Sequence, residues 1–355
     1  MSHSDTPPAT PPATMRDVAQ RAGVSLATVS YVVNRGPKPV SDELRERVRS
    51  AMRELDYKPA RRGRAPRHPL LVGAVVPDMT NMFFSRAIGA AGALLGAEGH
   101  LMVASSSNGD HDREAELLST FTRLGVAGLL VAPAGEVSAE LERLAADGMP
   151  IVLLDWDAEG NRLDRVALDN HGSAYRATRL LIENGHRRIA FVGGPELVSS
   201  AQQRLAGYRD ALASARLLEF ANIRGGPYTH EAGRAAALDL LSEIHPPEAI
   251  FSGGVLLTLG VLQALRERHM RLTEDIALVG YGDARWASVL IPPLTVIEQP
   301  VEQLGEMAVK LLLSSRYGRA AWQHVVLESR LVVRESHWRS ARAADQSADL
   351  ISHVV

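Results

Sequence analysis

The chain has 355 residues, of which 46% are apolar and 23% are charged, and its formal net charge at pH 7 is −2. This composition is typical of a globular protein of two or three domains. The absence of cysteine excludes disulfides and thiolate metal sites, and the absence of an apolar run of about 18 residues argues against a membrane-spanning helix. Residues 1–13 are rich in proline and lack the features of a secretory signal, so we expect a disordered tail on a cytoplasmic protein.

Basic residues are concentrated at the front of the chain. Residues 1–68 hold 13 Lys and Arg against 7 Asp and Glu, a balance of +6, so the remainder carries −8. A basic segment on an acidic body indicates a polyanionic partner such as nucleic acid, although a solvated basic surface has the same balance.

Three short helices are predicted within residues 14–58. Thr14 is a suitable N-cap for the first, which ends at Gly23. Ser25 begins a second helix over 25–34, and a third follows Ser41 with Leu44, Val48, Met52 and Leu55 at helical spacing. Two helices joined by a tight glycine turn and braced by a third form the helix-turn-helix pattern, although a plain three-helix bundle has the same periodicity.

A helix-turn-helix places its second helix in the major groove of DNA. The outward residues near the start of helix 25–34 are then candidates for base contacts, namely Leu26, Ala27 and Tyr31. Thr14, Ser25, Thr28, Ser30 and Asn34 are candidates for the remaining DNA contacts, since their polar side chains can reach phosphates.

Residues 59–69, PARRGRAPRHP, form a basic linker rich in proline and glycine, which indicates a domain boundary. Arg61, Arg62 and Arg64 are expected to contact phosphates; insertion into a narrow minor groove and a merely solvated linker are the alternatives.

From residue 70 onward, short apolar runs alternate with helical stretches. The expected strands are 70–77, 101–105, 126–133, 150–155, 188–194, 249–254 and 276–282. Apolar strands alternating with helices predict parallel sheets covered on both faces, and about 270 residues are too many for one sheet of ordinary size. The expected fold class is therefore α/β, with two lobes behind an all-α head.

Several blocks of the sequence, in the same order, are similar to the lactose-repressor (LacI/GalR) family. The resemblance covers residues 14 to about 338 and is carried by TMRDVAQRAGVSLATVSYVVN (14–34), VSDELRERVRSAMRELDYKP (40–59), VPDMTNMFF (76–84), NGHRRIAFVGGP (184–195), RLAGYRDAL (204–212), GYGD (280–283), IPPLTVIEQP (291–300) and LVVRES (331–336). It implies a transcriptional regulator, expected to be a nucleoid-associated repressor of a catabolic operon.

The resemblance also implies a domain plan. An effector-binding and dimerisation body like that of periplasmic binding proteins spans 70–340, and the chain crosses between its lobes three times. Lobe 1 is expected at about 70–168 with 299–325, and lobe 2 at about 169–298 with 326–340. The head is expected at 14–58, the linker at 59–69 and a tail at 341–355, which shows no leucine heptad, so we expect a homodimer rather than a tail-made tetramer.

In the family the linker forms a hinge helix that inserts a leucine into the minor groove. Here Pro66 falls about where that leucine belongs and Gly63 interrupts the segment, so helix formation is costly.

Ligands of open α/β sheets bind at the carboxyl ends of strands. That rule and the resemblance together suggest Phe84, Asp155, Arg204 and Tyr228 as effector contacts. The rings of Phe84 and Tyr228 can stack on a ligand ring. Arg204 can donate bidentate hydrogen bonds to hydroxyls or an anion, and Asp155 can accept hydrogen bonds from hydroxyls. Phe83 beside them is expected to be core, and Asp155 has helix capping as an alternative.

Two effector positions depart from the family pattern. Gly254-Val255 stands where the family usually has Asn-Asp, and Gly282 stands where it usually has Asp, with Asp283 next. Loss of those side chains is expected to enlarge the pocket. A small sugar effector stays possible, as do a bulkier glycoside, an aromatic or anionic ligand, or no effector.

Enzyme motifs are not evident. VGGPE at 192–196 is neither a dinucleotide fingerprint nor a phosphate loop, and no histidine pair has metal-ligand spacing. His68, His111, His186 and His245 adjoin turn residues and are expected to be solvated. We expect no enzyme, cofactor or metal. A sugar-binding transport protein and a sugar kinase are the rival interpretations; the DNA-binding head argues against the first, and no motif supports the second.

Overall fold

The computed structural model describes residues 14–34, 40–55, 57, 69–156, 162–316 and 322–338. By contacts the chain divides into two compact units, Met1–His68 and Pro69–Val355. The tails, Gly63, Pro66, His68 and the linker arginines Arg61, Arg62 and Arg64 lie outside the described residues. No described helix is long and apolar enough to cross a membrane.

The head is a three-helix unit, α1 (Met15–Ala22), α2 (Leu26–Asn34) and α3 (Asp42–Glu54). Its core contains apolar residues at helical spacing along the three helices, namely Val18, Ala19, Ala22, Val29, Val48 and Ala51. The third helix ends near Glu54, earlier than the sequence suggested, because Leu55 already has non-helical backbone angles.

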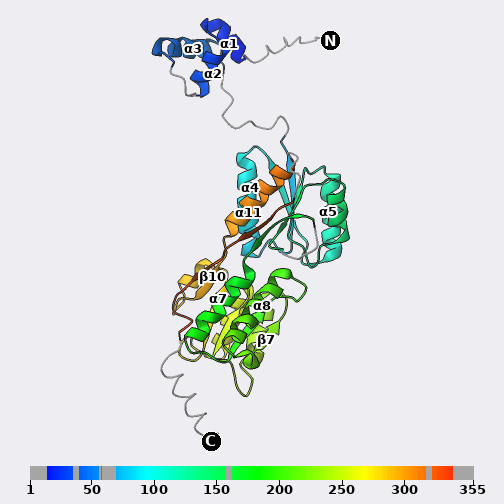
Figure 1. The fold of residues 1–355 in the computed structure, drawn as a ribbon, viewed down its shortest axis with the longest axis vertical. Coiled ribbons are helices and arrows are strands. Elements are labelled where there is room, and N and C mark those ends of the chain that lie inside the picture. The colour runs from blue at the N-terminus through cyan, green and yellow to red at the C-terminus, as the bar shows by residue number, and fades with distance from the viewer. Residues whose placement is uncertain are drawn as a thin grey trace, which may run out of the picture. The chain divides into compact units, whose positions relative to one another are not determined.

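The body contains two six-stranded sheets (Figure 1). The first has the order β11-β5-β4-β3-β1-β2 and the second the order β12-β10-β9-β8-β6-β7. The strands of the first are β1 (Leu71–Val76), β2 (Leu101–Ser106), β3 (Leu129–Val131), β4 (Ile151–Leu154), β5 (Asp164–Leu168) and β11 (His324–Leu327). Those of the second are β6 (Ile189–Gly193), β7 (Asn222–Gly225), β8 (Ala249–Ser252), β9 (Ala277–Tyr281), β10 (Thr295–Glu298) and β12 (Arg330–Val332).

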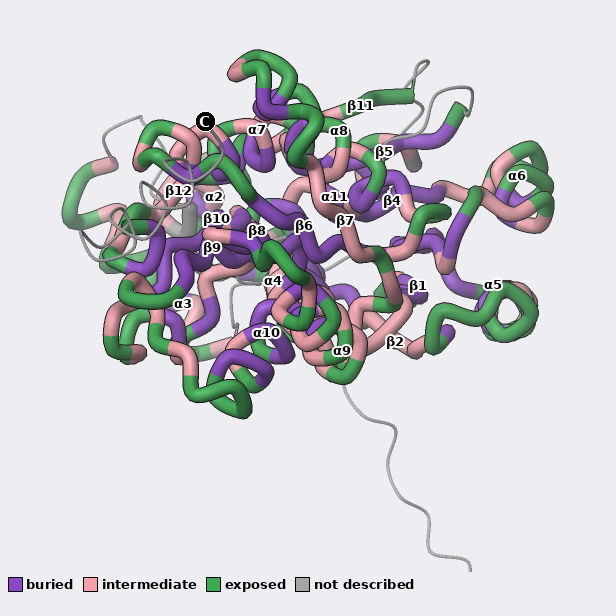
Figure 2. The backbone as a smooth tube through the Cα atoms, turned by 90° about the horizontal axis from the view of Figure 1, so that it is seen from below, coloured by how far each residue is buried: buried purple, intermediate pink, exposed green. Residues whose placement is uncertain are grey.

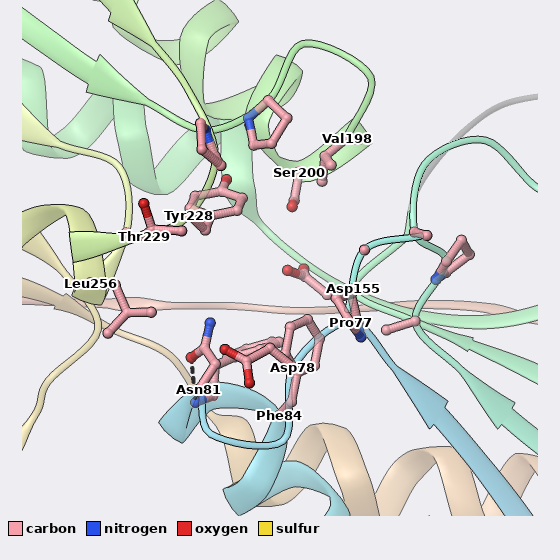
Figure 3. Close-up of a pocket in the computed structure, with 18 of the residues that line it drawn as sticks. Pro77, Asp78, Asn81, Phe84, Asp155, Val198, Ser200, Tyr228, Thr229 and Leu256 are labelled. Atoms are coloured by element: carbon pink, nitrogen blue, oxygen red, sulfur yellow. Dashed lines mark hydrogen bonds between the residues drawn. The ribbon is translucent and has the colours of Figure 1, made fainter. Parts of the chain in front are cut away.

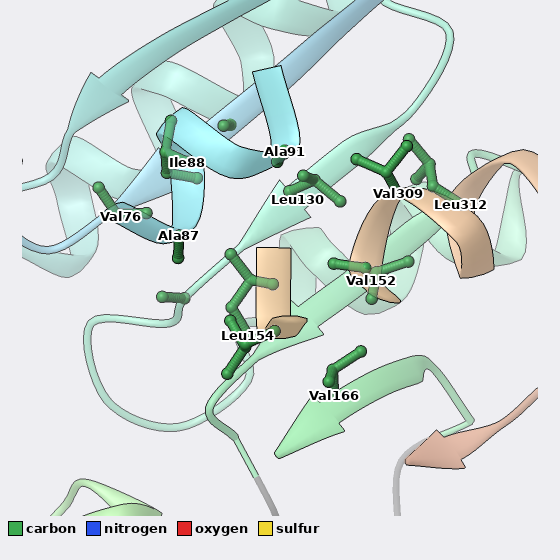
Figure 4. Packing of buried hydrophobic residues seen from close by; sticks show 14 of the residues in the cluster. Val76, Ala87, Ile88, Ala91, Leu130, Val152, Leu154, Val166, Val309 and Leu312 are labelled. Atoms are coloured by element: carbon green, nitrogen blue, oxygen red, sulfur yellow. The ribbon is translucent and has the colours of Figure 1, made fainter. Parts of the chain in front are cut away.

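Helices cover both faces of each sheet, as parallel sheets require. Lobe 1 has α4 (Met82–Ala97) and α11 (Val301–Arg316) on one face, with α5 (His111–Arg123) and α6 (Ala139–Ala146) on the other. Lobe 2 has α7 (Asn170–Glu183) and α8 (Ser199–Ser214) on one face, with α9 (His230–Leu240) and α10 (Val255–Glu267) on the other. Figure 4 shows α4 and α11 packed on the lobe 1 sheet, and Figure 2 shows the inner strands β6, β8 and β9 buried.

The three lobe crossings fall after β5, after β10 and after β11. The last one lies at residues 328–329 rather than 325–326, because β11 continues to Leu327 in the lobe 1 sheet. The lobe 2 sheet also differs from the all-parallel expectation, since β12 pairs antiparallel with β10. The chain enters β12 directly after the third crossing, with no helix to reverse its direction.

Candidate functional site

A cavity of about 1110 Å³ lies between the two lobes (Figure 3). Lobe 1 contributes the ends of β1 and β4 and the start of α4; lobe 2 contributes the start of α8, the loop after β7 and the start of α10. Five of the six predicted effector positions line it, namely Phe84, Asp155, Arg204, Tyr228 and Gly254. Because strand carboxyl ends meet there, the cavity lies where ligands of open α/β sheets bind.

Asp155 and Arg204 form an ion pair across the cavity floor. Oδ2 of Asp155 in lobe 1 lies 3.5 Å from Nη2 of Arg204 in lobe 2, and the two side chains are 9% and 7% exposed. Asp155 follows β4 with φ at 49°, a left-handed conformation that residues with a Cβ rarely adopt. Arg204 lies in the second turn of α8.

A polar network fixes the arginine. Its Nε donates to Oδ1 of Asn170 at 2.8 Å and its Nη1 donates to the carbonyl of Gly253 at 2.7 Å. The Tyr281 ring packs against the guanidinium, with 3.9 Å from Cζ to the ring centroid. The Tyr281 hydroxyl in turn donates to Asn170 at 3.1 Å. Arg204 is therefore held as part of the cavity floor.

Burial controls the charges of this floor. Desolvation raises the pKa of Asp155, and the nearby Arg204 charge and the Asn170 hydrogen bond oppose the rise. For Arg204, desolvation alone would lower the pKa, but the neighbouring tyrosines and Asp155 outweigh it and raise the pKa. Burial also raises the pKa of Tyr228 and of Tyr281. The tyrosines therefore stay neutral hydrogen-bonding groups near neutral pH.

The Tyr228 ring occupies a slot made by two glycines. A Cβ at Gly254 would lie 2.8 Å from Cδ1 of Tyr228, and a Cβ at Gly194 would overlap its Cζ. The tyrosine ring therefore occupies the space directly beside Gly254. The phenol oxygen accepts from Nη1 of Arg204 at 3.4 Å.

Gly282 does not line the main cavity. It lines a neighbouring hollow of about 20 Å³, with φ at 91°. Asp283 beside it forms a bidentate pair with Arg334, at 3.0 and 2.8 Å. The Asp283 carboxylate, one position after the place where the family usually has Asp, is therefore paired with Arg334 outside the main cavity.

The start of α4 supplies the opposite wall. Phe84 and Phe83 pack edge to face, with ring centroids 5.1 Å apart, and both line the cavity while packing on the lobe 1 core. Asn81 caps α4 by accepting from the Phe83 N–H at 3.0 Å, and its amide nitrogen points toward the cavity (Figure 3). The expectation that Phe83 is core therefore describes only part of its environment.

Sequence reasoning missed several residues of the site. Asn170 directly follows β5 and its crossing, so the strand-end rule could have found it. Tyr281 ends β9 and Leu256 lies shortly after β8, so the same rule applies to them, whereas Ser200 carries no comparable signal because its partners are distant in sequence. In the described residues, no group of three or more His, Cys, Asp or Glu is placed to hold a metal ion.

One histidine expectation is wrong. His186 is 2% exposed rather than solvated, and its Nε2 lies 3.0 Å from the carbonyl oxygen of His337. The C-terminal segment covers it. His111 lines the cavity and is exposed, His245 is exposed, and His68 lies outside the described residues.

The head is held by its helix caps. Thr14 and Asp17 form a capping box on α1, Gly23 ends that helix with φ at 61°, and Ser25 accepts from the Thr28 N–H at 3.1 Å. Arg47 of α3 donates to the carbonyl of Ala22 at 2.8 Å and so satisfies the end of α1. The tight turn between α1 and α2 is thereby fixed by residues of all three helices.

Apart from Thr14, which caps α1, the described residues predicted to contact DNA lie on α2 and at its start. Leu26 is 46% exposed and Tyr31 is half-buried. The Ser25 and Thr28 hydroxyls lie 2.9 Å apart at the helix start, and Ser30 is half-buried further along. The side chains of Ala27 and Asn34 fall outside the described part of the helix.

Comparisons with known proteins agree with this architecture. Residues 14–60 match the model of bacterial regulatory proteins of the lacI family, and residues 178–337 match a periplasmic binding protein-like domain. The ribose operon repressor of Haemophilus influenzae is 32% identical over 91% of this chain and 98% of its own. The HTH-type transcriptional repressor PurR of Klebsiella pneumoniae is 33% identical over 91% of this chain and 96% of its own.

Solved structures give the same result. A lac repressor dimer bound to operator and an anti-inducer has a TM-score of 0.70 and 28% identity over 92% of this chain and 99% of its own. A CelR–cellobiose complex has a TM-score of 0.68 and 31% identity over 91% and 99%. The head and the two-lobed body define a DNA-binding transcriptional regulator rather than an enzyme. Within that class, the chain belongs to the lacI family of bacterial regulatory proteins.

Proposed function

We propose that this chain represses a catabolic operon as a homodimer, under the control of a carbohydrate-like molecule bound between its lobes. The observation that carries the proposal is the interlobe cavity with the Asp155–Arg204 pair at its floor, in a chain that also bears a helix-turn-helix head. A ligand that contacts both lobes can favour one relative arrangement of the lobes over another. If the two arrangements differ in affinity for DNA, the ligand changes how tightly the chain binds its operator.

The head binds the major groove through α2. Leu26 and Ala27 offer apolar contact to thymine methyls, and Tyr31 offers one hydroxyl to a base edge. Thr14, Ser25, Thr28, Ser30 and Asn34 contact the sugar-phosphate backbone. The start of α2 supports this role, because a helix N-terminus suits a phosphate and Leu26 is exposed there.

The linker arginines Arg61, Arg62 and Arg64 contact phosphates beside the head. Contacts of this kind add affinity that does not depend on base sequence and that falls with rising salt.

Two copies pair through their bodies and present two heads to a pseudo-palindromic operator. The loop after the short 3-10 helix at Arg285–Ser288 supports a partner surface. It exposes two large apolar side chains, with Val289 74% and Ile291 98% exposed. Burial of these side chains against a second copy would remove them from water.

The polar part of the cavity suits a hydroxylated ligand. Asp155 offers acceptor oxygens beside Ser200, and Asp78 and Asn81 face them from α4 and its preceding loop (Figure 3). Carboxylate and amide groups converging on one space are suited to sugar hydroxyls, which donate and accept. Coupling between ligand and operator is expected at about 1–3 kcal/mol.

Selection of bound sequences from random duplex DNA tests the DNA-binding half of the proposal. We expect the full chain to enrich a pseudo-palindrome with half-sites about one helical turn apart. Tyr31→Ala should relax preference at one or two base pairs in each half-site, whereas Gln20→Ala, an exposed change on α1, should leave the selected site unaltered. Enrichment of no symmetric site, or an unchanged site with Tyr31→Ala, would contradict the docking proposed here.

A further inference from the structure

The charges of the cavity wall restrict its ligand. Among the described residues that line it, Arg204 is the one Lys or Arg, against three acidic residues, Asp78, Asp155 and Glu196. The positive charge of Arg204 balances the negative charge of Asp155. No other Lys or Arg among the described lining residues balances the carboxylates of Asp78 and Glu196. An anionic ligand would therefore be placed beside uncompensated negative charge.

Arg204 has little capacity left for an anion. Its Nε and Nη1 donate to Asn170 and to the Gly253 carbonyl, and Nη2 faces Asp155. The Tyr281 ring covers one face of the guanidinium. A phosphate could bind the Arg204 guanidinium only by displacing Asp155. The Asp155 carboxylate would then stay buried without a counter-charge.

The remaining polar groups are a mixture of donors and acceptors. Helices α8 and α10 begin in the wall, and their N-caps Val198 and Gly254 make no side-chain hydrogen bond to the first turns, whose N–H groups therefore lack a capping side-chain acceptor. Asp78 supplies acceptor oxygens and Asn81 an amide nitrogen from the other lobe. Hydroxyls can satisfy both kinds of group, whereas a phosphate only accepts near neutral pH.

An apolar surface adjoins these groups in lobe 2. The Tyr228 ring, fixed between Gly194 and Gly254, lies near Leu256 and opposite Phe84 (Figure 3). Val255 and Val198 also line this side, where the family pattern has a polar pair in place of Gly254-Val255. Aromatic and aliphatic side chains in this arrangement suit a ligand's apolar ring or chain.

The volume is consistent with a ligand of two parts. At about 1110 Å³ the cavity slightly exceeds the roughly 300–1,000 Å³ seen for small-molecule sites. A single sugar ring that used the polar groups at Asp155 would leave the Leu256 side chain, which lies apart from Asp155 in Figure 3, uncovered.

We propose that the cavity takes an uncharged glycoside with an apolar or aromatic substituent, and that it rejects phosphorylated sugars. The sugar ring lies against Asp155, Asp78 and Asn81, and the substituent lies against Tyr228, Val255 and Leu256. This inference rests on the proposed effector role of the cavity and specifies the chemical class of its ligand.

Calorimetric titration of the full chain tests the inference. The probes are phenyl α- and β-glycosides of glucose, galactose and xylose, the matching free sugars, and glucose and galactose 6-phosphates. We expect at least one phenyl glycoside to bind at least tenfold more tightly than its free sugar. Neither phosphate should bind more tightly than its parent sugar.

Two variants locate the effect. Leu256→Asp should abolish the tenfold preference for the phenyl group, and Leu256→Lys, which supplies the missing cation, should improve 6-phosphate binding at least tenfold. Ile244→Asp and Ile244→Lys are matched controls, because Ile244 is 92% exposed and does not line the cavity. Retained binding of the selected operator shows that each variant is folded.

Tighter binding of a sugar phosphate than of its parent sugar by the unmodified chain would overturn the inference. Equal affinities for phenyl glycoside and free sugar would overturn it too, as would binding by none of the probes. Each of these outcomes is independent of operator selection, so failure of the ligand class is distinguishable from failure of the DNA-binding role.

Discussion

Asp155 of lobe 1 and Arg204 of lobe 2 approach to 3.5 Å, with both side chains more than nine-tenths buried. Removal of one partner leaves the other buried without its counter-charge, a change that typically costs about 3–5 kcal/mol.

We therefore expect Arg204→Ala and Asp155→Ala each to lower the free energy of unfolding of the body by about 3 kcal/mol. The double variant should lose much less than the sum of the two single losses, because the second removal relieves a buried charge. Urea unfolding of the four proteins measures this coupling. Losses that add within about 0.5 kcal/mol would show that the pair is energetically independent.

The slot around Tyr228 gives a second prediction. Gly254→Ala places a Cβ 2.8 Å from Cδ1 of Tyr228, so the ring must move and its contact with a bound ligand is lost. We expect the affinity for the preferred glycoside to fall at least tenfold. Gly225→Ala is the matched control, since its Cβ would meet only the Gly194 oxygen at 3.7 Å and Gly225 also lines the cavity. Equal effects of the two changes in calorimetric titration would contradict the slot.

Stability should depend on pH through His337. Burial lowers the pKa of His337, with the charge of nearby His186 acting in the same direction. The Thr295 hydroxyl lies 2.9 Å from Nδ1 of His337. Arg334, three residues before His337, follows strand β12. Since the folded state takes up the proton less readily than the unfolded state, stability is full above about pH 6.5 and falls as the pH is lowered through this range.

Thermal unfolding of the full chain between pH 7.5 and 5 measures this dependence. We expect the melting temperature of the unmodified chain to fall more steeply with acidification than that of His337→Gln, whose side chain does not titrate. Parallel pH profiles would mean that His337 contributes nothing to the acid sensitivity.

The exposed apolar loop gives a prediction on assembly. Ile291→Asp places a charge on a side chain that is 98% exposed in the single chain. If this loop packs against a second copy, the charge would be buried unpaired and the dimer weakened. Sedimentation velocity should show at least a tenfold weaker dimer, while Ile244→Asp leaves the dimer intact. A stable dimer with Ile291→Asp would exclude the loop, and a stable tetramer of the unmodified chain would contradict the dimer itself.

The sequence predicted those features that depend on local pattern. Helical spacing identified the head core residue Val48, and apolar runs located strands such as Leu71–Val76. The strand-end rule brought Asp155 and Tyr228 to one cavity. These features follow from periodicities of 3.6 and 2 and from the geometry of parallel sheets.

What the sequence did not predict depends on contacts between distant segments. The Gly194–Tyr228–Gly254 slot joins three loops, and Asn170 links Asp155, Arg204 and Tyr281. The pairing of Asp283 with Arg334 depends on the third lobe crossing. A single sequence shows the residue types but not which of them meet in space.

The most direct test of control from the cavity is the affinity for the selected operator duplex, measured by fluorescence anisotropy with and without each sugar and glycoside of the panel. We predict that at least one uncharged compound changes the affinity of the unmodified chain by about 5- to 150-fold, and that the same compound has no effect on Arg204→Ala. If no compound changes operator affinity, or if Arg204→Ala responds as the unmodified chain does, the cavity does not control DNA binding in the way proposed here.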